Sequence, residues 1–307
     1  MRVFYHPLKR SEMVVGIYPE EPQNRLTEIQ QLATRWSRQV REIGSAHIKF
    51  RIARTGESRL APLSREKVNS ILDEAKLEEH PENFEAVLAK LRETPATEKR
   101  LSTPGEFYSI GLMTRESWGD RVHVFDGEWD LDYSAANNQI SVFRAGESRT
   151  ALLQVGDFRV QRGRMDFAQF AQELQPNNRI VLTAGGNKIL ADWTTGFVHQ
   201  ISRTGSDAED TFQFAPTRYP GGIVFPKLKI ELRYSSNELS RLELVYIDDA
   251  VFNQGTVGDT FKLAAKAGTN VFMFKPDPVA RPSFLRVGED TADVVGLIRE
   301  REGKDAQ

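Results

Sequence analysis

The first clear pattern along the chain is an apolar stripe at helical spacing, which is followed directly by strict alternation of apolar and polar residues. Apolar residues recur at steps of three and four over 26–43, which predicts an amphipathic helix. Gly44 follows that stripe, as is common after the last turn of a helix. Over 46–52, apolar and polar residues then alternate, so we expect a strand with one buried face.

Helical spacing returns over 62–98, in two short pieces. Ser64 is placed to cap the first piece, and His80-Pro81 separates it from the second. The stretch is rich in charged residues, so we expect it to lie outside or across a sheet as a helical insertion.

Short alternating segments separated by turn residues dominate the remainder. The predicted strands are 122–124, 129–133, 139–143, 179–183, 188–194, 197–201, 211–214, 224–234, 241–247, 261–263 and 271–274. Helices are expected at 166–174, capped by Asp166, and at 292–299. Short turns and one apolar face per strand predict a mainly β (α+β) fold, a curved antiparallel sheet whose apolar face is covered by the helices at 26–43 and 166–174.

Composition narrows the classes of partner. Lys+Arg (41) and Asp+Glu (43) nearly cancel, so no global attraction to nucleic acid is expected. No run approaches the 18 or so apolar residues of a membrane span, and the first residues have no apolar core typical of a signal peptide. By these signals alone, a cytoplasmic location is not excluded. The chain has no cysteine, which excludes disulfides and thiol chemistry.

Motifs that carry chemistry are absent from the sequence. It has no phosphate-binding loop and no nucleophile elbow, and its five histidines are scattered, so we expect no catalytic residues, no metal and no cofactor. Asp126, Glu128, Asp130 and Asp132 alternate along a predicted strand, too far apart to close together on one ion, and are expected on a solvated outer face. His47 and His123 are expected to be solvated as well. A hydrolase site assembled from scattered residues stays the less favoured alternative.

Three segments resemble the LolA/LolB superfamily of lipoprotein carriers, which includes RseB-type envelope-stress sensors. They are LTEIQQLATRWSRQVREIGSAHIKFRI, the hairpin VFDGEWDLDYSAANNQISVF and the closing FKLAAKAGTNVFMF, which has Lys266 where the family usually has proline. The resemblance implies a half-open β-barrel over 26–276 with the insertion at about 62–98, an extension at 1–25 and a tail with a short helix at 277–307. The family's basic residue near the cavity mouth has no counterpart by motif, and Arg115 and Arg121 correspond to it by position only.

The family also implies a function. It would be non-enzymatic binding of a lipid or lipoprotein acyl group in the periplasm or cell envelope. The apolar cavity would then be lined by Trp36, Phe50, Trp129, Leu131, Tyr133, Leu228, Ile230 and Leu232. For each aromatic residue, ordinary core packing is the alternative interpretation. The alternative function is a structural or regulatory domain with a filled barrel, which binds an envelope protein on its outer surface.

Overall fold

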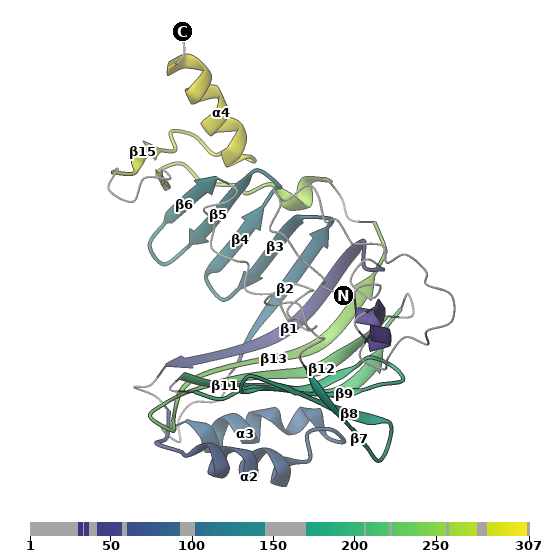
Figure 1. Ribbon diagram of the computed structural model, residues 1–307. Helices are drawn as coiled ribbons and strands as arrows, with labels where there is room; N and C mark the ends of the chain where they lie inside the picture. Colours follow the sequence, from purple (N-terminus) through teal and green to yellow (C-terminus); the bar gives the residue numbers. More distant parts are fainter. Residues whose placement is uncertain are drawn as a thin grey trace, which may run out of the picture.

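One sheet of 15 strands runs through the protein, seen in a computed structural model (Figure 1). The structure describes residues 30–32, 34–36, 42–56, 60–92, 102–144, 170–205, 207–220, 223–255, 258–274 and 281–305. The two edge strands are not paired with each other, so the sheet stays open and does not close into a barrel. The predicted fold class, mainly β with an open curved sheet, is confirmed.

The strands follow one another mostly as antiparallel hairpins. They are β1 (Ser45–Gly56), β2 (Thr103–Ile110), β3 (Met113–Trp118), β4 (Arg121–Phe125), β5 (Trp129–Ser134), β6 (Gln139–Arg144), β7 (Ala171–Gln175), β8 (Arg179–Ala184), β9 (Asn187–Asp192), β10 (Val198–Arg203), β11 (Asp207–Arg218), β12 (Val224–Ser235), β13 (Glu238–Phe252), β14 (Asn270–Met273) and β15 (Ser283–Arg286). Their order across the sheet is β15-β14-β6-β5-β4-β3-β2-β1-β13-β12-β11-β10-β9-β8-β7. Strand β1 therefore joins two meanders, and among the described strands only β14 and β6 pair in parallel.

Turn chemistry explains several of the hairpins. The Asp126 carboxylate accepts hydrogen bonds from the backbone N–H groups of Glu128 and Trp129, at 2.8 and 2.7 Å, which closes the β4–β5 turn. Gly127 in that turn has φ +101°, a conformation that favours glycine. The predicted turn at 185–187 likewise connects β8 to β9.

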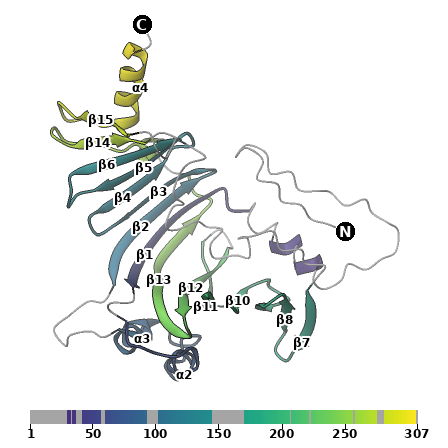
Figure 2. The ribbon, with the colours of Figure 1, turned by 60° about the vertical axis from the view of Figure 1, so that its left-hand side comes forward.

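The register of the strands assigns side chains to two faces. Ile52 lies opposite Val245, and these two side chains define what we call the inner face. Their neighbours Ala53 and Leu244 are also paired, and because successive side chains alternate they point to the outer face. Figure 2 shows the curvature of the sheet, with α2 and α3 on one side and the helical segment near residue 36 on the other.

Two helices of the predicted insertion cover part of the outer face. They are α2 (Arg65–Ala75) and α3 (Phe84–Leu91), joined through a 3₁₀ turn at Pro81–Asn83. The Ser64 hydroxyl accepts a hydrogen bond from the N–H of Lys67, which caps α2 as predicted. The apolar side of both helices packs on strands β12, β13 and β1. The insertion therefore lies on the sheet and forms a core with it.

The C-terminal segment covers the other part of the outer face. It comprises the 3₁₀ turn Gly258–Phe261, β14, β15 and α4 (Val294–Asp305). Val294, Val295 and Ile298 of α4 are buried together with Val124 and Leu131 of the sheet. No helix among the described residues is both long enough and apolar enough to cross a membrane.

Three sequence predictions of local structure are wrong. Residues 171–174, expected in a helix, belong to the exposed edge strand β7, whose backbone pairs with β8; residues 166–169 lie outside the described part. Residues 261–263, expected in a strand, are the last residue of a 3₁₀ turn and two residues without regular structure. Strands β2 and β3 were not expected. The 26–43 stretch is described as helical at 30–32 and 34–36.

Candidate functional site

The inner face carries a continuous apolar strip across the middle of the sheet. It spans β12, β13, β1 and β2, with Val245, Ile247 and Phe252 from β13. The strip is completed by Ala46, Ile48, Phe50, Ile52, Phe107, Phe225 and Ala250. From Ala46 to Ile52, it extends about 20 Å along β1 at roughly 3.3 Å per residue. Among the described residues, Ile43, Trp118, Tyr219 and Ile223 pack against it.

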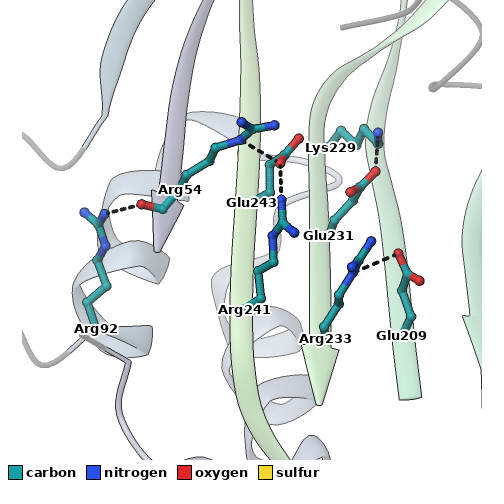
Figure 3. Close-up of polar contacts among 8 residues, drawn as sticks. All are labelled: Arg54, Arg92, Glu209, Lys229, Glu231, Arg233, Arg241 and Glu243. Carbon is teal, nitrogen blue, oxygen red and sulfur yellow. Dashed lines mark hydrogen bonds and ion pairs between the residues drawn. The ribbon is translucent and has the colours of Figure 1, made fainter. Parts of the chain in front are cut away.

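Along β1 and β13, charged residues directly follow the apolar residues of the strip. Beyond Ile52 and Val245 the next inner-face residues are Arg54 and Glu243, which form an ion pair at 2.8 Å. Figure 3 shows how further inner-face charges continue from there across β12 and β11. We call this set the charged band; it comprises Arg54, Glu209, Lys229, Glu231, Arg233, Arg241 and Glu243. The inner face is thus amphipathic along the strand direction.

Burial within the charged band is uneven. The Lys229 side chain is only 5 % exposed and pairs with Glu231, whereas Arg233 and Glu209, 3.6 Å apart, are much more open to solvent. Glu243 holds both Arg54 and Arg241, the latter at 3.7 Å. The buried members are therefore neutralised within the band, and the exposed arginines stand at its rim.

A buried polar cluster flanks the strip on the β3–β5 side. His123 of β4 and Asp130 of β5 are joined through Nε2 and Oδ1, and both residues are buried. Glu116, directly opposite His123 on β3, is also buried. Burial opposes the charged imidazolium, but the hydrogen bond and the charge of Asp130, with Glu116 and Asp132, outweigh it and raise the pKa of His123. This cluster favours a protonated histidine.

The expectation that His123 and Asp130 are solvated is wrong. The hairpin places the acidic face of β5 on the inner side of the sheet, where Asp130 is 2 % exposed. The alternation of β4 and β5 with the Asp126-Gly127 turn was a usable signal, because it predicts that His123 and Asp132 face each other. The alternation along β4 and β5 did not, however, predict that the polar face of these strands would be buried.

The structure divides the eight predicted cavity residues between the two faces. Trp36 and Phe50 lie on the inner face, where the Trp36 indole N–H donates to the carbonyl of Gly196 at 2.6 Å. The other six lie on the outer face: Trp129, Leu131 and Tyr133 under the C-terminal segment, and Leu228, Ile230 and Leu232 under α2 and α3. They are not brought together into one cavity, and their role in binding a ligand stays a prediction.

Titratable side chains do not gather into a metal site in the described residues, where no group of three or more His, Asp or Glu could hold an ion. Of the two positional counterparts of a basic mouth residue, Arg121 is an exposed inner-face residue 3.8 Å from Asp132. Arg115 lies on the outer face. The inner face therefore carries buried apolar residues that are bordered by charge.

Comparison with known proteins yields similarity of fold alone. No family model matches the chain, and no curated protein matches it. One similar solved structure, from Vibrio parahaemolyticus, is described as an outer membrane lipoprotein-sorting protein domain, at 7 % identity and TM-score 0.45, covering 75 % of this chain and 94 % of that one.

Two further solved structures are similar at the same level. A DUF1329 family protein from Desulfovibrio piger has 10 % identity and TM-score 0.41, covering 76 % of this chain and 97 % of that one. A LolA superfamily protein from Nitrosomonas europaea has 9 % identity and TM-score 0.33, covering 75 % and 97 %.

Proposed function

We propose that this protein is a non-enzymatic binding protein that holds the acyl group of a lipid or lipoprotein on the inner face of its sheet. The apolar strip carries the proposal, because it offers extended hydrocarbon contact without hydrogen-bonding demands on a ligand. Each methylene group removed from water contributes about 0.8 kcal/mol, so contact along a strip of this length would hold a long chain firmly.

The charged band supports the same assignment. An acyl chain always continues into a polar group, and the strip continues along β1 and β13 into Arg54 and Glu243. Exposed arginines at the rim, Arg233 and Arg241 among them, are suited to receive a polar or anionic head. An amphiphile would therefore match the inner face in both polarity and direction.

Access to the strip requires movement. Ile48 and Phe50 are each 1 % exposed, so an acyl chain reaches them only when the residues packed above them separate from the sheet. Such a carrier would act in the periplasm or cell envelope, with lipid or lipoprotein as its cargo. The energy of opening would be regained from the methylene groups that the ligand buries.

Adjacent residues of β13 provide a matched test. Val245 lies in the strip, whereas Leu244 lies under α2 and α3, and both are almost fully buried. We expect palmitate to raise the unfolding midpoint of the wild-type protein and to co-purify in native mass spectrometry. Val245→Ala removes two methylene equivalents, about 1.6 kcal/mol, and should weaken palmitate binding by up to about 15-fold. Leu244→Ala should destabilise the fold and leave that affinity unchanged.

The outcomes discriminate between the functions. Equal loss of affinity in the two variants would place the ligand elsewhere, and absence of any bound lipid or thermal shift would refute acyl binding. In the second case a filled sheet that binds an envelope protein on its surface becomes the better hypothesis. The burial of the strip in the free protein is the observation that favours this alternative.

A further inference from the structure

A cleft of about 830 Å³ lies on the outer face, between the sheet and the chain that follows β13. Its floor comes from β1, β2 and β3, and its other wall comes from residues 254–255 and 259–264, which include part of the 3₁₀ turn Gly258–Phe261. This volume falls in the range of pockets that take small organic molecules. The cleft is on the face opposite the apolar strip, so a ligand bound in it would be independent of the proposed function.

The floor of the cleft is a row of cross-strand neighbours. Val251, His47, Tyr108 and Arg115 follow one another in register across β13, β1, β2 and β3. The rings of His47 and Tyr108 stack with centroids 4.2 Å apart and planes 11° apart. Because the two rings lie face to face, they offer their edges to the cleft beside the guanidinium of Arg115.

Arg115 is a cation without an acidic partner among the described residues. Its Nη1 donates to two backbone carbonyls, those of Lys262 at 2.8 Å and Thr260 at 3.4 Å, which fix the side chain in the cleft. Burial lowers the pKa of Arg115, and no carboxylate offsets this effect. The remaining donors of its planar fork are available to a ligand.

A second polar atom in the cleft lacks a partner. Nε2 of His47 is buried and makes no hydrogen bond, although a buried ring nitrogen normally has one. The Tyr108 hydroxyl, in contrast, is already engaged, because it donates to Glu106 at 2.9 Å. His47 and Arg115 belong to the same row, one on each side of Tyr108, and both residues line the cleft.

We propose that this cleft binds a small molecule with a flat body and a single carboxylate, which Arg115 holds while the body lies against His47 and Tyr108. A guanidinium fork matches a carboxylate in a bidentate manner. A single negative charge is preferred because Lys262, the other cation that lines the cleft, is already paired with Asp259 at 2.8 Å, and Glu106 would repel a second negative charge. Nε2 of His47 would hydrogen-bond to a polar group on the body of the ligand.

Benzoate is a suitable probe, with inorganic phosphate as the comparison. We expect benzoate to bind the full-length wild-type protein in isothermal titration calorimetry, and more tightly than phosphate does. Arg115→Gln should weaken benzoate binding at least tenfold, as expected for loss of charge-assisted hydrogen bonds. Arg121→Gln is the matched control: it removes an arginine from the next strand on the opposite face, and should leave the affinity within about twofold.

A second variant guards against misfolding of Arg115→Gln. His47→Phe keeps an aromatic ring against Tyr108 and removes both ring nitrogens, the unpartnered Nε2 among them. It should weaken the binding of a hydroxybenzoate more than the binding of benzoate. Absence of benzoate binding, or benzoate binding that survives Arg115→Gln in a folded protein, would overturn the proposal. Tighter binding of phosphate than of benzoate would overturn the assignment to a monocarboxylate.

Discussion

The ion pair between Arg65 and Asp210 allows a sharp test of what attaches α2 to the sheet. Arg65 is the first residue of α2, and its Nε donates to Oδ2 of Asp210 at 2.6 Å while Nη2 donates to Oδ1. The Asp210 side chain, on β11, is 1 % exposed, and that of Arg65 is 21 % exposed. Water can therefore solvate Arg65 if Asp210 is removed, but it cannot easily solvate Asp210 if Arg65 is removed.

This asymmetry sets the expected magnitudes. Arg65→Met leaves a buried carboxylate without its cation, a change that typically costs about 3–5 kcal/mol of unfolding free energy. Asp210→Leu leaves a guanidinium that can turn toward water, so the loss should be smaller, about 1–3 kcal/mol. The double variant buries two apolar side chains and no charge, so it should lie within about 1 kcal/mol of the wild type.

Urea unfolding of the four proteins, followed by circular dichroism, measures the cycle. The expected result is a strong favourable coupling, in which the double variant is more stable than Arg65→Met alone. If the double variant loses the sum of the two single losses, the two side chains are not coupled and the expected magnitudes are refuted. If Asp210→Leu lowers the free energy of unfolding more than Arg65→Met does, the exposure of the remaining partner does not determine how large the loss is.

Two further predictions concern the inner face. Because the pKa of His123 is raised on folding, its imidazolium stabilises the folded state fully below the unfolded pKa of about 6.5, and this stability is lost as pH rises through the higher folded pKa. In denaturant titrations, the wild type should therefore exceed His123→Gln in stability by more at pH 6 than at alkaline pH. A difference that grows with pH would contradict the assignment. Gly105→Ala should lower the free energy of unfolding by about 1–3 kcal/mol, because the new Cβ would lie 2.6 Å from the ring of Phe50. Gly288→Ala is the control, since a Cβ there meets no atom within 4 Å. Equal losses of stability in the two variants would show that the contact with Phe50 is relieved without cost.

Local pattern predicted the strands whose alternation was undisturbed. The segment 224–234 and its partner 241–247 lie within β12 and β13, because one face of each is buried against α2 and α3 and the register repeats every second residue. The hairpin from Trp129 is equally clear, since a turn residue, Asp126, closes it. The helices of the 62–98 insertion followed from Ser64 and the apolar spacing after it.

Tertiary context decided the rest. Strand β7 reads as a helix because Phe170 and Leu174 are one helical turn apart, yet its backbone is held by β8, a partner that local spacing does not contain. Strand β2 contains Pro104 and Gly105, residues that weaken a strand pattern, and Gly105 is accommodated here by close packing on Phe50. The site was harder still, because both faces of this sheet are buried and apolar residues alone do not tell them apart.

The central place of β1 has a consequence for how the chain reaches this structure. The meanders β1–β6 and β7–β13 are built mostly from hairpins between sequence neighbours, which form quickly because each closes a short loop. The β1–β2 connection is the exception, because it contains α2 and α3. The join between β1 and β13 closes the largest loop of the sheet, so we expect it to form late, after the hairpins. Until then, each meander exposes a long unpaired edge of a dozen or so residues, able to pair with another copy of the chain. The seam that unifies the sheet is therefore also the point at which its assembly is most exposed to aggregation.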